Sequence, residues 1–176
     1  TPRSSSAASD VYKRQRSYPQ PRSDADWDEF AREVTHRTEA WLDEGYGECV
    51  FADATLANEM AKSLVHFQNE RYLTTCLCVM HNHVHLVMKP NVGFELEDIL
   101  EGLKGFVSRK VNRHLSRTGV LWEQESFDRI IRDEEHLFRV IQYIGRNPGK
   151  AGYAREQWVG WIYPEGEELG WGFRAE

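Results

Sequence analysis

The sequence is poor in cysteine and has no long hydrophobic run. Its three cysteines, Cys49, Cys76 and Cys78, form no CxxC pair, which excludes a cysteine zinc site and a disulfide framework and favours reduced thiols. No apolar stretch approaches the roughly 18 residues of a membrane span, and no secretory segment is recognisable. These absences predict a globular cytoplasmic protein that has no membrane partner.

The composition fits a single folded domain with one locally basic region. The 176 residues are 40% hydrophobic and 12% aromatic, which suffices for one core rather than two. The net charge is -6, yet residues 102–155 hold 11 basic and 6 acidic side chains, whereas the remainder holds 11 and 22. This asymmetry indicates a surface for a polyanion; ordinary solvated helix faces are the alternative.

Three segments are expected along the chain. Residues 1–25, rich in Ser, Pro and Arg, are predicted to form a disordered leader, part of which resembles a translated sequencing adapter. Residues 26–155 are predicted to form the folded domain, and residues 156–176 a Trp- and Gly-rich tail without a clear period. Hydrophobic periodicity predicts helices over 26–44, 53–69, 96–116 and from Asp133 to 147–149, and strands over 72–80, 83–88 and 127–131.

The first strand is predicted to be central in its sheet. Leu77 and Val79 point to one side, while Cys76 and Cys78 point to the other. Apolar residues on both faces are typical of a strand that is covered on both sides.

The next strand carries two histidines at alternate positions, His83 and His85. Alternate residues of a strand share one face, so both imidazoles are expected to project together and can reach one divalent ion. Val84 between them would face the core. An isolated pair of this kind is also compatible with a purely structural role.

Tyr143 lies on the predicted fourth helix, away from its buried stripe. Its neighbours one turn before and after are Arg139 and Asn147, so one helix face offers a guanidinium, a phenol and an amide. An ordinary amphipathic edge is the alternative interpretation.

Three motifs in this order resemble one family, the single-tyrosine HUH transposases, particularly the REP-associated tyrosine transposases of bacteria. HUH denotes His, a hydrophobic residue and His. The matching stretches lie within residues 45–155 and are MHNHVHL at 80–86, LWE at 121–123 with FDRIIRD at 127–133, and YIGRNPGKAG at 143–152.

The resemblance implies an α+β fold, a ferredoxin-like antiparallel sheet packed with helices. It implies that His83 and His85 bind a divalent metal, Mg or Mn, that Asn147 is a third ligand, and that Tyr143 is the nucleophile. The implied activity is cleavage and rejoining of single-stranded hairpin DNA through a 5′-phosphotyrosine, by a monomer or homodimer at the bacterial nucleoid.

Two features depart from the family pattern. The family has Pro at the position where this chain has His81. His81 could stiffen the turn less than Pro, or it could compete with the histidine pair as a metal ligand. The family also begins with a sheet strand before its first helix, where this chain has the adapter-like segment and an irregular stretch at 16–26. One alternative is therefore a sheet that lacks its first strand.

The basic residues of the charged region are expected to contact DNA phosphates. They are Lys104, Arg109, Lys110, Arg113, Arg129, Arg132, Arg139, Arg146 and Lys150. Two other functions are left open. One is a DNA-binding protein of the same fold that recognises repeated palindromes without cleaving them. The other is a metal-dependent phosphohydrolase, which would need a carboxylate at the metal and would survive the loss of Tyr143.

Overall fold

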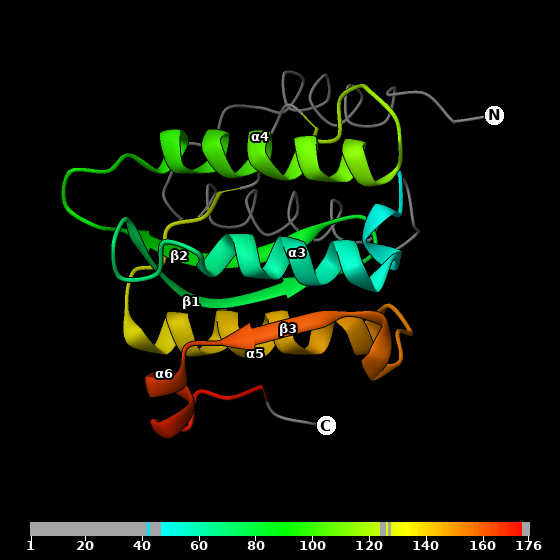
Figure 1. Cartoon of the computed structure of the whole chain (residues 1–176). Helices are drawn as coiled ribbons and strands as arrows, with labels where there is room; N and C mark the ends of the chain where they lie inside the picture. Colours follow the sequence, from blue (N-terminus) through cyan, green and yellow to red (C-terminus); the bar gives the residue numbers. More distant parts are fainter. Residues whose placement is uncertain (1–41, 43–46, 124–125, 127, 174–176) are drawn as a thin grey trace, which may run out of the picture. The chain divides into compact units, whose positions relative to one another are not determined.

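The computed structural model describes residues 42, 47–123, 126 and 128–173, all within the unit Ala40–Glu176 (Figure 1). The elements in chain order are η1 (Val50–Ala52), α3 (Ala54–Val65), β1 (Tyr72–Val79), β2 (Val84–Pro90), α4 (Leu96–His114), α5 (Glu134–Lys150), η2 (Arg155–Gln157), β3 (Val159–Ile162) and α6 (Pro164–Glu168). The predicted leader, the helix over 26–44 except for the helical Leu42, and the place of a first strand lie outside the described residues.

The three described strands form one antiparallel sheet in the order β2-β1-β3. The prediction that β1 is central is therefore confirmed. Cys78 of β1 pairs with His85 of β2 on one side and with Gly160 of β3 on the other. Directly paired residues point to the same face of a sheet, so this row of three faces one side together.

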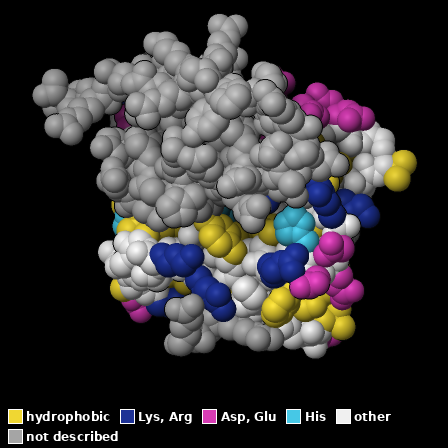
Figure 2. Space-filling view, turned by 180° about the vertical axis from the view of Figure 1, so that it is seen from behind, with side chains coloured by type: hydrophobic (Ala, Val, Ile, Leu, Met, Phe, Trp, Pro, Cys, Tyr) yellow, Lys and Arg dark blue, Asp and Glu magenta, His cyan; other side chains and the backbone are white. Residues whose placement is uncertain are grey.

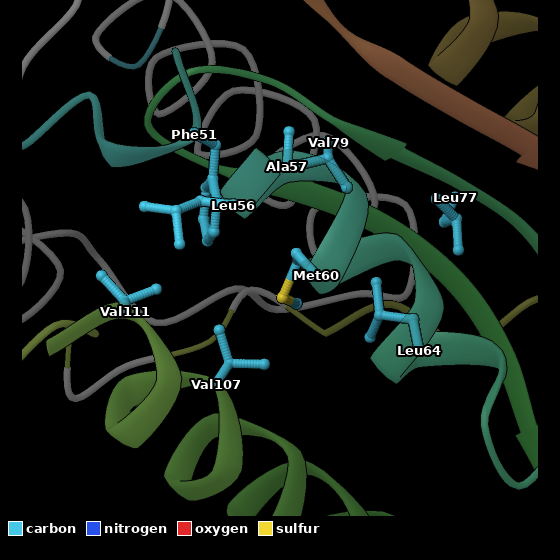
Figure 3. Close-up of a cluster of buried hydrophobic side chains, with 9 residues drawn as sticks. All are labelled: Phe51, Leu56, Ala57, Met60, Leu64, Leu77, Val79, Val107 and Val111. Carbon is cyan, nitrogen blue, oxygen red and sulfur yellow. The ribbon is translucent and has the colours of Figure 1, made fainter. Parts of the chain in front are cut away.

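Helices cover the two faces of the sheet, and each face has its own hydrophobic core. The first core joins α3 and α4 to Leu77 and Val79 of β1 (Figure 3). The second joins α5 to Cys76, Cys78 and Met80. The first core comprises Phe51, Leu56, Ala57, Met60, Leu64, Leu77, Val79, Val107 and Val111. The predicted α+β class and helix-packed antiparallel sheet are confirmed.

Two aspartates fix where α3 and α5 begin. The carboxylate of Asp53 accepts hydrogen bonds from the backbone N–H groups of Thr55 and Leu56, at 2.8 and 3.3 Å. These bonds to the charged form lower the pKa of Asp53. Asp133 caps α5 in the same way through the backbone N–H of His136, at 2.7 Å. The predicted start of this helix at Asp133 is confirmed.

The fourth helix ends one residue beyond the predicted 147–149, because α5 continues through Pro148 to Lys150. The chain leaves the helix at Gly152, whose φ of +76° is a conformation that glycine adopts without strain. Asn147 therefore lies within the last turn of α5.

The predicted strand over residues 127–131 is also wrong for the described residues 128–131, which form no regular structure. Ile131 packs against the second core, whereas Ile130 is 84% exposed. Within the described part of the chain, no strand lies beside this segment to accept its backbone hydrogen bonds. Its apolar residues therefore do not form a strand.

The C-terminal segment supplies a strand that the sequence pattern did not reveal. The predicted boundary between residues 155 and 156 falls inside η2, and β3, which follows, pairs with β1 over four residues. The described part of the predicted tail thus contributes to the sheet. No helix in the described residues is both long and apolar enough to cross a membrane.

Candidate functional site

His83, directly before β2, and His85, within it, lie side by side. His83 and His85 are two positions apart, and their Nε2 atoms are 3.1 Å apart with the rings nearly perpendicular. Val84 and Leu86 point the opposite way and pack against the first core. Strand alternation therefore places both imidazoles on the face that α5 covers.

The hairpin turn before β2 orients His83. The backbone N–H of Met80 donates to the carbonyl of His83 at 2.9 Å, which closes the turn. The Nδ1 atom of His83 is 2.8 Å from the side-chain oxygen of Asn82, an acceptor that favours a proton on Nδ1. The lone pair of His83 then lies on Nε2 and faces His85, the arrangement that an orienting partner gives a metal ligand.

Both imidazoles are neutral at neutral pH. Burial lowers the pKa of His83 to about 4. Burial, with a further contribution from His83, lowers the pKa of His85 to about 3. Removal from water disfavours the charged form of a base, so both rings keep nitrogen lone pairs available well below pH 7.

Helix α5 brings Asn147 and Tyr143 to this pair. The Nδ2 atom of Asn147 is 2.6 Å from Nε2 of His85, and Asn147 is only 2% exposed. Tyr143 lies one turn earlier, with its ring perpendicular to that of His85 and the ring centres 6.3 Å apart. Residues four apart share one helix face, so the two side chains approach the histidines together.

The donor atoms fit a divalent metal ion. Two nitrogens bound to one ion at about 2.1 Å and a right angle are about 3.0 Å apart, close to the spacing of the two Nε2 atoms. The amide of Asn147 presents an oxygen at the same place when it rotates by a half turn, which exchanges Oδ1 and Nδ2. His83, His85 and Asn147 could therefore hold one ion.

No carboxylate joins this set within the described residues, which contain no group of three or more His, Cys, Asp and Glu side chains suited to an ion. The site would therefore keep the positive charge of a divalent ion, because neutral ligands do not cancel it.

Three cations of α5 surround Tyr143. Arg139, Arg146 and Lys150 line an open hollow of about 300 Å³ together with Phe138, Gln142 and Tyr143. The ammonium of Lys150 lies 5.2 Å from the centre of the Tyr143 ring. Arg139 also pairs with Glu135 at 2.5 Å, where both side chains are exposed. In the view from behind, Lys and Arg side chains gather beside hydrophobic and His side chains (Figure 2).

The remaining predicted DNA-binding residues are placed elsewhere. Those of α4 belong to a helix of the opposite face of the sheet, where Lys110 pairs with Glu59 and Lys104 donates to Ser126 at 2.7 Å. Two further basic residues of α4 are exposed, Arg109 and Arg113. The segment before α5 carries the last two, Arg129 and Arg132, which are also exposed. The structure thus divides the predicted basic set, and only the α5 members adjoin Tyr143.

Two residues beside the site, His81 and Asn82, make contacts that the sequence analysis did not predict. His81, considered as a competing ligand, instead stacks on Tyr153 with ring centres 4.2 Å apart. This contact ties the hairpin turn to the chain just after α5. Asn82 contacts His83, the residue directly after it in the chain. An amide directly before the histidine motif is a sequence signal that could have indicated this contact.

Comparisons with known proteins identify the family of the chain. The family model described as "Transposase IS200 like" matches residues 50–147, more than half of the chain. A Haemophilus influenzae protein named "Putative REP-associated tyrosine transposase" is 28% identical over 90 residues, which are 46% of this chain and 51% of that protein. The chain thus spans about half the length of this curated relative. No solved structure matches the chain. The matched region runs from η1 through both histidines and Tyr143 to Asn147, and the chain belongs to the IS200-like transposase family.

Proposed function

We propose that the protein is a metal-dependent tyrosine transposase that cuts and rejoins single-stranded, hairpin-containing DNA. The observation that carries this proposal is the meeting of His83, His85 and Asn147 beside Tyr143, from a strand and a helix that are distant in sequence. Family membership and the name of the Haemophilus influenzae relative support the same reaction class.

Tyr143 would act as the nucleophile. Its phenolic oxygen forms a bond to the phosphorus of a DNA phosphodiester, and the bond from phosphorus to the 3′-oxygen breaks. The phenolic proton leaves to solvent and the departing 3′-oxygen takes one up, which gives a 5′-phosphotyrosine and a free 3′-hydroxyl. The covalent bond retains the phosphodiester linkage, so a 3′-hydroxyl can reverse the step and join strands without ATP.

His83, His85 and Asn147 would hold Mg²⁺ or Mn²⁺, and the bound ion would offset the negative charge of the scissile phosphate. The burial that keeps both imidazoles neutral also keeps them able to bind a cation at neutral pH. Asn82 keeps the Nε2 atom of His83 turned toward the site by accepting from Nδ1.

The cations of α5 would position the DNA strand. Arg139, Arg146 and Lys150 stand around Tyr143, where a phosphate must approach for attack. Lys150 lies 5.2 Å from the centre of the Tyr143 ring, where its charge would help to hold a DNA phosphate near the phenol. Because Tyr143 and the three metal-binding candidates meet within one chain, we propose that one subunit would carry out one cut, as a monomer or within a homodimer.

The experiment that tests this function separates cleavage from binding. Tyr143→Phe is expected to abolish nicking of a panel of single-stranded hairpin oligonucleotides in Mn²⁺, while affinity for the same oligonucleotides stays within about threefold. Tyr163→Phe is the matched control, because Tyr163 contacts Trp161 and lies outside the site. Cleavage is read on denaturing gels.

Two outcomes would contradict the proposal. Equal nicking by Tyr143→Phe and the unmodified chain would favour a phosphohydrolase that activates water. Hairpin binding with no covalent adduct in any metal would favour a DNA-binding protein that does not cut.

A further inference from the structure

Helix α5 contains a glycine at the point where the helix must approach another segment. A Cβ atom at Gly145 would lie 2.5 Å from Cδ1 and 2.8 Å from Cγ of Phe173, closer than real Cβ atoms come. Glycine is unfavourable inside a helix relative to alanine, but at Gly145 the absence of a side chain leaves room for the Phe173 ring. Phe173 therefore packs directly on the α5 backbone at Gly145, which lies between Tyr143 and Asn147 in the sequence.

The same phenyl ring contacts the sheet at a second glycine. A Cβ atom at Gly160 of β3 would lie 3.0 Å from Cε2 of Phe173 and would also collide with the ring of Trp158. The rings of Phe173 and Trp158 are themselves in contact, with centres 6.3 Å apart. Phe173 is thus a spacer between α5 and β3.

The position of this spacer relates it to the histidines. Gly160, Cys78 and His85 pair across the three strands in a single row. Paired residues face the same side, so Phe173 presses on α5 from the row of the sheet that carries His85. The separation of α5 from this row sets how closely Asn147 approaches His85.

A hydrogen bond fastens the same segment to the helix. The side chain of Gln142, which is 6% exposed, donates from Nε2 to the carbonyl oxygen of Gly172 at 2.9 Å. Gln142 and Gly145 are three positions apart and share one face of α5, so residues 172–173 hold this face of the helix at two points, one before and one after Tyr143 in the sequence.

We propose that Phe173, seated in the notches of Gly145 and Gly160, is a positioning residue that holds α5 so that Asn147 and Tyr143 meet the histidine pair. The inference rests on the proposed function for its consequence in catalysis, while the placement of Asn147 against His85 can be measured without DNA.

Gly145→Ala and Phe173→Ala test this role, and Gly149→Ala is the matched control. Gly149 lies one turn further along α5, and a Cβ atom there would meet nothing within 4 Å. Adduct formation is measured at saturating hairpin DNA, at a temperature where circular dichroism shows every variant folded. A displacement of reacting groups by about 1 Å can cost about a hundredfold, so Gly145→Ala and Phe173→Ala are expected to slow the reaction by about tenfold or more. Gly149→Ala keeps the rate.

The double variant Gly145→Ala with Phe173→Ala separates positioning from a general loss of packing. The added methyl group has no ring left to displace, so the double variant is expected to be no slower than Phe173→Ala alone. A rate reduction in the double variant equal to the product of the two single reductions would overturn the proposal.

The ¹⁵N resonance of His85 Nε2 in the metal-free, DNA-free protein gives a second readout. It is expected to shift in Gly145→Ala and Phe173→Ala and to stay unchanged in Gly149→Ala. An unchanged resonance in both of the first two variants would overturn the positioning role. An unmodified chain that forms no adduct would contradict the proposed function, and the imidazole resonance would still decide this inference.

Discussion

The buried histidine pair predicts a steep loss of stability in mild acid. His83 has an ordinary pKa of 6.5 that burial lowers to about 4, and His85 is lowered further, to about 3. The unfolded chain therefore binds protons at these positions at a pH where the folded chain does not. The contribution to stability is fully present above pH 6.5 and is lost as the pH falls from there toward 4.

The size of the effect follows from the number of protons. Each proton bound only by the unfolded chain gives a slope of about 1.4 kcal/mol per pH unit. Two buried histidines approach twice that slope, about 2.7 kcal/mol per pH unit, near pH 5. For His83 alone, the fall from 6.5 to about 4 corresponds to about 3 kcal/mol.

Urea denaturation of chelator-treated protein at several values between pH 7 and pH 4.5 measures this slope. His83→Gln removes one titrating ring. The slope of unfolding free energy against pH is therefore expected to fall by the contribution of about one proton, about 1.4 kcal/mol per pH unit. His66→Gln is the control, because His66 is exposed. A free energy of unfolding that stays constant over this range, or an equal slope in His83→Gln and the unmodified chain, would refute the argument that the pair is buried and neutral.

Two further outcomes are expected. Iodoacetamide at pH 8 should label one cysteine in the folded chain and three in urea, because Cys49 is exposed whereas burial raises the pKa of both Cys76 and Cys78 to about 12; rapid labelling of all three in the folded chain would contradict that burial. Lys150→Ala should lower the dependence of hairpin affinity on salt by about one unit of slope, as expected for one lost phosphate contact, while Lys62→Ala on α3 should leave it unchanged; an unaltered slope in Lys150→Ala would remove it from the DNA surface.

The local patterns of the sequence carried much of the fold and of the candidate site. Apolar residues on both faces of β1 identified a central strand, and strand alternation placed His83 beside His85. The four-residue spacing of Tyr143 and Asn147 placed both on one helix face. Each of these rests on a period of two or of 3.6 residues, which a single segment displays by itself.

What the sequence did not reveal depends on distant partners. The short strand β3 contains Gly160, a residue that disfavours strands and that is explained here only by its contacts with Trp158 and Phe173. The stack of His81 on Tyr153 joins positions that no periodicity links. Helix α5 contains Pro148 in its last turn, a residue that disfavours helix interiors, while the apolar side of the helix packs on the sheet.

The most direct test of the account is to find which residue becomes attached to DNA and whether the attachment needs a divalent metal. The chain is incubated with a cleavable hairpin oligonucleotide in Mn²⁺ or in chelator, digested with trypsin and analysed by mass spectrometry. The account predicts a nucleotide phosphate on Tyr143 in Mn²⁺, none in chelator, and none in a His85→Gln variant that is still folded. Attachment to another tyrosine, or the same yield on Tyr143 without metal, would contradict a shared site of the histidine pair and Tyr143.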